Sequence, residues 1–209
     1  MAKSDLKALR GADTEQVGAY YDEWAHTYDD DLAAFGYQAP QWVAEQIAAV
    51  VDDRQAQILD AGCGTGLTGQ ELKALGYTRL TGIDVSTSSL EIARTKGCYA
   101  NVQRQNMDQA LAFADNSFDA ITCVGMLAYI KHSQALMAEF CRVVRPGGFV
   151  VFTQSDDFYL DAFTAALEHL VDNGSWTLHA HTGPHPYLPR HPDYGDDTTI
   201  YIDTYKVIA

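Results

Sequence analysis

A short apolar run that passes directly into three closely spaced glycines is the feature that most constrains the fold. Residues 58–61 have strand length and are apolar except for Asp60, and Gly62, Gly64 and Gly66 follow at once. Apolar residues then recur at helical spacing up to Gly76. Glycine adopts positive φ values and lets a backbone approach a ligand closely. The segment therefore predicts a strand, a tight turn and a helix, with a nucleotide-like ligand over the turn.

The same alternation of strand and helix continues along most of the chain. Further strand-length runs occupy residues 80–84, 99–105, 118–125 and 149–153. Such alternation favours right-handed crossovers and a parallel sheet. Two last runs, 176–181 and 199–208, have no helix between them and are expected to pair as an antiparallel hairpin at one edge. The predicted class is α/β, a doubly wound, mostly parallel seven-stranded Rossmann-like sheet with an antiparallel C-terminal hairpin.

Helices are predicted where apolar residues recur every three or four positions. The first opens at Asp13 or Thr14, and the second starts near Pro40. The others are expected from the glycine turn to Gly76, from a capping box at Ser88 and Glu91 to Gly97, over 133–144 up to an Arg-Pro-Gly-Gly stop, and over 157–171. With 209 residues the chain fits one domain, in which 1–52 form a helical lid, 53–209 an α/β core and 182–198 a substrate-side loop.

The charge balance restricts the partners. Lys and Arg number 14 against 28 Asp and Glu, a formal net charge of −14. Such a field opposes nucleic acid and anionic membranes, so a small-molecule partner is expected. No apolar run reaches the roughly 20 residues of a membrane span, and the first residues lack an apolar signal core, so a cytoplasmic location is predicted. The sequence leaves the oligomeric state open.

The cysteines and histidines do not indicate a metal. The four cysteines are widely spaced without a CxxC pair and are predicted to be reduced thiols. His179 and His181 share one face of an expected strand, but no carboxylate–histidine spacing is diagnostic. We therefore predict no metal site.

Two carboxylates restrict the chemistry of the expected ligand. Asp84 ends the second strand, where a carboxylate can accept both hydroxyl groups of a ribose. Residues 64–69 also match the dinucleotide pattern GxGxxG. Asp60, just before the first glycine, would repel a pyrophosphate but attract an ammonium group. A nicotinamide-dependent oxidoreductase is thereby the weaker alternative.

Five ordered motifs resemble those of the class I S-adenosylmethionine-dependent methyltransferases. They are LDAGCGTG at 59–66, GIDVS at 82–86, QNMDQALAF at 105–113, DNSFDAI at 115–121 and RVVRPGGFVVFT at 142–153. The segments YDEWA at 21–25, YD at 28–29 and YQAP at 37–40 extend the resemblance to the methyltransferase-like proteins of the Williams-Beuren syndrome region. The resemblance implies S-adenosylmethionine as cofactor.

The resemblance also implies site residues. Gly62, Gly64 and Gly66 would pass under the methionine and ribose, and Asp60 would lie near the amino group. Asp84 would hold the ribose. The remaining cofactor contacts would come from Tyr28, Cys63, Val85, Asn106, Met107 and Val124. Plain alternatives stay open for three of these residues: a strand-end turn for Asp60, a helix cap for Asp84 and a turn for Asn106.

The acceptor is expected above the carboxyl ends of the fourth and fifth strands, near Gly125, Leu127, Thr153 and Gln154. The predicted substrate contacts are Tyr20, Trp24, Met126, Tyr129, Tyr187 and His191. Aromatic residues at helical spacing are also ordinary core residues, and the 182–198 loop is alternatively an exposed proline-rich connection. No catalytic residue is assigned, and the weak candidates are Tyr28, Tyr129, His181 and His185, with His191 a further possible base.

The predicted function is methyl transfer to a small molecule by in-line displacement. Positioning and desolvation supply most of the rate in such a reaction, so a dedicated catalytic side chain is not required. The attacking atom is left open among O, N, C and S. A protein that binds the cofactor without turnover, in a regulatory role, is the main alternative.

Overall fold

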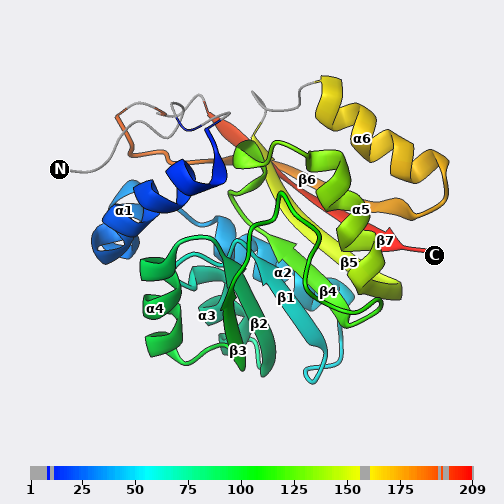
Figure 1. The fold of residues 1–209 in the computed structure, drawn as a ribbon, viewed down its shortest axis with the longest axis horizontal. Helices are drawn as coiled ribbons and strands as arrows, with labels where there is room; N and C mark the ends of the chain where they lie inside the picture. The colour runs from blue at the N-terminus through cyan, green and yellow to red at the C-terminus, as the bar shows by residue number, and fades with distance from the viewer. Residues whose placement is uncertain (1–8, 10–11, 156–160, 193, 195–197, 209) are drawn as a thin grey trace.

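A computed structural model describes residues 9, 12–155, 161–192, 194 and 198–208 of the chain (Figure 1). Its described strands form one seven-stranded sheet in the order β3-β2-β1-β4-β5-β7-β6. The strands are β1 (Gln57–Ala61), β2 (Arg79–Asp84), β3 (Asn101–Arg104), β4 (Phe118–Cys123), β5 (Val144–Ser155), β6 (Trp176–Pro186) and β7 (Thr199–Val207).

The predicted fold class is confirmed. β3, β2, β1, β4 and β5 pair in parallel, and β7 pairs antiparallel with both β5 and β6. The last strand of the chain thus lies inside the sheet, and β6 forms its edge. β2 and β4 lie on opposite sides of β1, so the direction in which successive strands are added to the sheet reverses at β1. Ligands of doubly wound sheets bind at the carboxyl ends of strands at such a reversal.

Most helix ends follow the sequence signals. The helices are α1 (Thr14–Phe35), α2 (Ala39–Val50), α3 (Leu67–Ala74), α4 (Thr87–Lys96), η2 (Leu127–Tyr129, a 3-10 turn), α5 (Ser133–Val143) and α6 (Asp161–Asp172). Asp13 caps α1 through a reciprocal capping box with Gln16, and Gly97 ends α4 with φ 60°. Among the described helices, none combines the length and the apolar character that a membrane crossing needs.

The predicted start of α4 is wrong. Ser86, not Ser88, is the N-cap, and its hydroxyl accepts the N–H of Ser89 at 3.1 Å. The N–H of Ser88 is instead taken by the Asp22 carboxylate of α1 at 2.8 Å. The N-cap of α4 therefore lies two residues before the predicted one, and α1 contacts the first turn of α4.

Other boundaries differ from the prediction because of backbone pairing. β6 continues to Pro186, which pairs with Thr199, so the connection to β7 covers 187–198 rather than the predicted 182–198. β5 begins at Val144 and includes the Arg-Pro-Gly-Gly segment expected to stop the preceding helix ahead of a strand at 149–153, because Val144 already pairs with Phe118. β3 is shorter than predicted. α6 is described from Asp161, and the predicted helical residues 157–160 lie outside the described residues.

Helices cover both faces of the sheet. Adjacent β1 residues divide between the faces: Ile58 packs with α2 and α3, and Leu59 packs with α5 and α6. All the side chains at the centre of both layers are inaccessible to solvent, including Ile47, Leu72 and Phe140. These two apolar layers hold the strand ends that carry the site.

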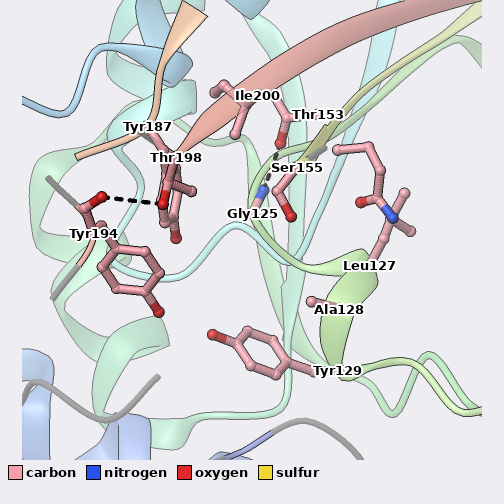
Figure 2. A pocket seen from close by; sticks show the side chains of 11 residues that line it. Gly125, Leu127, Ala128, Tyr129, Thr153, Ser155, Tyr187, Tyr194, Thr198 and Ile200 are labelled. Atoms are coloured by element: carbon pink, nitrogen blue, oxygen red, sulfur yellow. Dashed lines mark hydrogen bonds between the residues drawn. The ribbon is translucent and has the colours of Figure 1, made fainter. Parts of the chain in front are cut away.

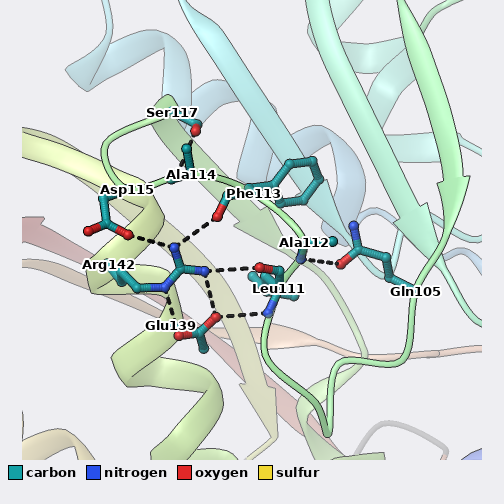
Figure 3. Close-up of polar contacts among 9 residues, drawn as sticks. All are labelled: Gln105, Leu111, Ala112, Phe113, Ala114, Asp115, Ser117, Glu139 and Arg142. Carbon is teal, nitrogen blue, oxygen red and sulfur yellow. Dashed lines mark hydrogen bonds and ion pairs between the residues drawn. The ribbon is translucent and has the colours of Figure 1, made fainter.

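A charged network ties the loop after β3 to α5 (Figure 3). The Arg142 guanidinium donates to the backbone carbonyls of Leu111 and Phe113 at 3.0 and 2.8 Å. It also forms a fork with Glu139, with N···O distances of 2.8 and 2.7 Å. The Glu139 carboxylate accepts the N–H of Leu111, and the Arg142 fork holds the pKa of Glu139 below its usual value. One side-chain pair thus satisfies three backbone groups of the loop.

Removing this fork should loosen the loop. We expect Arg142→Met to lower the free energy of unfolding by about 1–3 kcal/mol, because two backbone carbonyls lose a charged donor at a partly exposed site. Arg142→Lys should recover only part of the loss, since an ammonium group cannot reproduce the fork. Urea unfolding of the three proteins measures this, and equal midpoints for Arg142→Met and wild type would contradict it.

Candidate functional site

The glycine turn after β1 is held on the end of β2. The N–H groups of Gly62 and Cys63 donate to the carbonyl of Ile83 at 2.8 and 2.9 Å. Gly62 and Gly64 have φ values of 80° and 50°, which favour glycine. A Cβ on Gly62 would lie 2.1 Å from Met126 Cγ, whereas a Cβ on Gly64 would meet no atom within 4 Å. Close packing thus requires the first glycine, and open space lies beside the second.

Asp84 joins the two neighbouring strand ends. One carboxylate oxygen accepts the N–H of Gly64 at 2.9 Å, and the other accepts the N–H of Ser86 at 2.9 Å. Burial raises the pKa of Asp84, and these backbone hydrogen bonds oppose the shift. Each carboxylate oxygen keeps acceptor capacity after one such bond. Asp84 therefore shapes the turn and can still accept from a ligand, and Ser86 takes the helix-cap role.

A central cavity of about 420 Å³, open mouth included, lies between the glycine turn and α1. Its lining residues are Val17, Tyr21, Tyr28, Gly62, Gly64, Asp84, Val85, Ser89, Val124, Gly125 and Met126. Because Gly62 follows β1 and Gly125 follows β4, the cavity lies between the two strand ends at which the strand order reverses. Strand ends form its floor, and the aromatic face of α1 forms its roof.

Two smaller cavities adjoin the central one. The Asn106-side cavity shares Val17, Val85 and Met126 with it and is further lined by Thr14, Gln105, Asn106, Met107, Asp108, Tyr129 and Ile130. The glycine-side cavity shares Tyr28, Gly62, Gly64 and Val124 with it and adds Tyr37, Pro40, Cys63, Thr65, Leu67 and Thr68. Together they form one elongated site along the carboxyl ends of β1, β2 and β3.

Polar contacts attach α1 to all three loops of this site. Asp22 accepts from the Ser86 hydroxyl at 2.7 Å as well as from Ser88. Asp29 accepts from the Thr65 hydroxyl at 2.5 Å. Thr14 donates toward Asp108 at 3.1 Å. The lid helix is therefore positioned by the loops that it covers.

The charges of the site favour a cationic ligand. Of the described residues that line these cavities, the charged ones are Asp84 and Asp108. Burial raises the pKa values of Tyr21 and Tyr28, so both phenols stay neutral. Neutral aromatic faces beside carboxylates attract positive charge and give a pyrophosphate no counter-charge.

A fourth cavity, the strand-end cavity, opens beside the central one and encloses about 510 Å³ with its mouth (Figure 2). Its lining residues are Gly125, Leu127, Ala128, Tyr129, Thr153, Gln154, Ser155, Tyr187, Tyr194, Thr198 and Ile200. Gly125 lines both this cavity and the central one. A second small molecule there would adjoin a ligand of the central cavity.

The structure brings most of the predicted cofactor residues together. The residues that line the cavities are Tyr28, Gly62, Cys63, Gly64, Asp84, Val85, Asn106, Met107 and Val124. Asp60 and Gly66 lie behind this lining. Asp60 is 1% exposed, and its carboxylate accepts from Tyr99 at 2.6 Å and Thr122 at 2.9 Å. Both of its carboxylate oxygens are therefore engaged inside the fold, by Tyr99 and by Thr122 of β4.

Asn106 is both a turn residue and a cavity-lining residue, the two roles that the sequence left open. Its side-chain oxygen accepts the N–H of Asp108 at 2.9 Å, which closes a local turn. The same residue lines the Asn106-side cavity. Its oxygen is thus already engaged, and contact with a ligand would use its remaining lone pair.

The predicted substrate residues separate into two groups. Met126, Tyr129 and Tyr187 line cavities. Tyr20 and Trp24 pack with other rings of α1, and the Trp24 indole donates to Asp31 at 2.7 Å. His191 is 2% exposed and lies edge-on to Phe35. This second group lines none of the four cavities.

The candidate histidine bases lie apart from one another. His181 Nδ1 is 2.6 Å from the buried Asp203 carboxylate, and the His181 ring stacks on Tyr201. His185 stacks on Trp42 of α2. Neither His181 nor His185 lines one of the four cavities. Asp203 and Tyr201 engage the His181 ring, and Trp42 engages the His185 ring.

Sequence reasoning missed Tyr21. Its ring lines the central cavity, and its hydroxyl bonds to that of Tyr129 at 3.1 Å. Val17, Tyr21 and Tyr28 lie at i, i+4 and i+11, which is one stripe of a helix. Tyr20 is about 60° away from that stripe on a regular helix. The helical phase could therefore have selected Tyr21 over Tyr20.

Comparisons with known proteins agree with this geometry. A family described as "Methyltransferase domain" matches residues 59–152. Human Methyltransferase-like protein 27 is 34% identical over 182 residues, which cover 83% of this chain and 74% of that protein. A ubiquinone biosynthesis O-methyltransferase of Xanthomonas oryzae pv. oryzae is 32% identical over 108 residues, which are 50% of this chain but only 45% of that protein.

Solved structures share the fold. The [4+2]-cyclase SpnF superposes with a TM-score of 0.73 at 19% identity, over 94% of this chain and 96% of that one. A TehB-like S-adenosylmethionine-dependent methyltransferase from Corynebacterium glutamicum has a TM-score of 0.67 at 20% identity, over 90% and 98%. At these identities the likeness concerns the fold alone.

The buried Asp60 should make stability depend on pH. Burial raises the pKa of Asp60 to about 6, against the hydrogen bonds from Tyr99 and Thr122. Between about pH 4 and 6 the folded state then binds more protons than the unfolded state, so the free energy of unfolding falls as pH rises. We expect the stability of Asp60→Asn relative to wild type to increase across this window, by at most about 3 kcal/mol.

Denaturant unfolding at several pH values measures this difference. Tyr99→Phe is the matched variant: it removes a hydrogen bond that lowers the pKa of Asp60 and should move the upper end of the window to higher pH. Parallel stability profiles for wild type and Asp60→Asn would show that the carboxyl is not perturbed.

Proposed function

Because the chain belongs to the class I S-adenosylmethionine-dependent methyltransferases, we propose that it transfers a methyl group to a small-molecule acceptor in the strand-end cavity. The central cavity with its two neighbours is the proposed cofactor site. The observation that carries the proposal is that Gly125 lines both cavities, so a molecule in the strand-end cavity would adjoin a ligand of the central cavity.

The residues present fit S-adenosylmethionine. Asp84 has acceptor capacity for ribose hydroxyls beside the open space at Gly64. The Asn106-side cavity offers Val85 and Met107 as apolar walls for a base. The side-chain nitrogen of Gln105 in the same cavity is buried without a partner in the described part of the chain, so it is available as a donor. The acidic lining suits a ligand that carries an ammonium and a sulfonium.

When bound, S-adenosylmethionine would supply an activated methyl group on a positively charged sulfur. The protein's own residues position the two reactants and exclude water from them. Tyr21 and Tyr28 of α1 cover the central cavity, and their buried rings exclude water. The backbone at Gly125, fixed by the Thr153 hydroxyl at 2.9 Å, sets the approach between the two cavities. Fixed approach and desolvation lower the barrier of methyl transfer.

The cytoplasm is the proposed location. Cys63, Cys98, Cys123 and Cys141 are all unpaired and buried. Free thiols in this number suit a reducing compartment.

Calorimetric titration with S-adenosylmethionine, S-adenosylhomocysteine and NAD tests the cofactor. Binding of the two sulfur compounds without a response to NAD is the expected result. Release of S-adenosylhomocysteine that depends on an added acceptor would then establish turnover. Binding with no release across an acceptor screen would favour the regulatory role, and NAD binding alone would favour an oxidoreductase.

Two glycines form a matched pair for the same titration. Gly64 and Gly97 both have positive φ, and a Cβ on either would meet no atom within 4 Å, but only Gly64 lines the cavities. Alanine at either position should cost about 1–2 kcal/mol of stability from backbone strain. We expect Gly64→Ala to weaken S-adenosylmethionine binding tenfold or more and Gly97→Ala to leave it unchanged. Equal affinities for the two variants would remove the glycine turn from the site.

A further inference from the structure

The Thr153 hydroxyl has a proton to donate inside the strand-end cavity. Thr153 lies near the end of β5 and is 4% exposed. Its oxygen accepts the N–H of Gly125 at 2.9 Å, which occupies one lone pair. No described residue accepts its proton. Since a buried donor without an acceptor is unfavourable, a ligand of this cavity should present an acceptor atom to Thr153.

The position of Thr153 identifies which ligand atom that is. The residue that it fixes, Gly125, lines the central cavity as well as the strand-end cavity. An atom hydrogen-bonded to Thr153 therefore lies at the junction of the two cavities. This is the place that the proposed function gives to the atom that receives the methyl group.

The outer walls of the strand-end cavity are aromatic. Figure 2 shows the hydroxyl ends of Tyr129 and Tyr194 turned toward each other from opposite walls. The rings of Tyr187 and Tyr194 meet edge to face at 5.2 Å and 84°. Burial raises the pKa of Tyr187, so this wall presents a neutral phenol. Edge and face contacts with tyrosine favour a planar ring as guest.

The described lining of this cavity includes polar side chains but no charged one. Hydroxyl and amide groups come from Thr153, Gln154, Ser155 and Thr198. Hydroxyl groups can solvate a neutral polar guest, whereas a carboxylate guest would lose its hydration without gaining a cationic partner.

We propose that the acceptor is an uncharged planar ring bearing a hydroxyl group, and that Thr153 donates a hydrogen bond to the oxygen that is methylated. This inference rests on the proposed function. The ring O–H proton leaves to solvent through the open mouth of the strand-end cavity, an oxygen lone pair bonds the methyl carbon, and the electron pair of the broken C–S bond remains on sulfur. The Thr153 hydrogen bond stabilises the negative charge that develops on the ring oxygen as its proton leaves.

Three probes of similar size separate the features of this acceptor. 4-Methylphenol is planar and neutral, 4-methylcyclohexanol is neutral without a planar ring, and 4-hydroxybenzoate is planar and anionic. Binding is measured by calorimetry on protein loaded with S-adenosylhomocysteine. We expect 4-methylphenol to bind at least tenfold more tightly than the other two, and equal affinity for either of them would overturn the proposal.

Variants of Thr153 test the hydrogen bond. Thr153→Val keeps the shape and removes the donor, and Thr153→Ser keeps the hydroxyl. The affinity for 4-methylphenol should fall about tenfold in Thr153→Val, which also removes the acceptor of the Gly125 N–H, and return to within threefold of wild type in Thr153→Ser, which keeps both hydrogen bonds. Unchanged 4-methylphenol binding in Thr153→Val would overturn the assignment.

Product analysis with S-adenosylmethionine separates this inference from the proposed function. Thr153-dependent binding of 4-methylphenol without methylated product would support the acceptor site and contradict methyl transfer. Methylation of all three probes at similar rates would support methyl transfer and overturn the acceptor class.

Discussion

The site depends on the hydrogen bonds that hold the end of β1 against the end of β2. Two N–H groups of the glycine turn donate to the Ile83 carbonyl, and the N–H of Gly64 donates to Asp84. These bonds require a backbone with positive φ at Gly62 and Gly64, which side-chain-bearing residues adopt only with strain. The tight turn leaves open space beside Gly64 and keeps one carboxylate at its edge. Every cavity of the proposed cofactor site borders this arrangement or the loop next to it.

The lid adds a roof whose position follows from the same loops. Asp22 bonds to the start of α4, and Asp29 bonds both to Thr65 of the glycine turn and to Lys96 at 2.5 Å. Thr14 reaches the loop after β3. A displacement of any of these loops would therefore move the aromatic stripe of α1 over the central cavity. The loops that border the proposed cofactor site are the same ones that hold α1 in place. The site would therefore exclude water only when α1 is packed on these loops.

The acceptor side is built by the C-terminal part of the chain. Since β7 inserts between β5 and β6, the connection after Pro186 starts on the ligand side of the sheet and folds back onto α1. Leu188 is fully buried there, and the N–H of Arg190 donates to the Phe35 carbonyl at 3.2 Å. This packing places Tyr187 and Tyr194 opposite Tyr129 (Figure 2). The solved cyclase shares this fold, and a fold by itself does not define a reaction.

By itself, the sequence determined the features that depend on local conformation. The glycine turn, the α1 cap at Asp13 and the strand and helix periods can be read from neighbouring residues, because φ preferences and side-chain direction act over a few positions. The order of the motifs, with the rule for parallel sheets, was enough to place Asp84 at the ligand side of β2.

Only the tertiary structure decided which side chains face the cavities. Asp22 of α1 binds the first turn of α4 through the N–H of Ser88, and Asp203 holds His181 outside the cavities. Each of these contacts joins residues that are far apart in the sequence or on different elements. Their free energies arise from burial and hydrogen bonding between elements, which local periodicity does not contain.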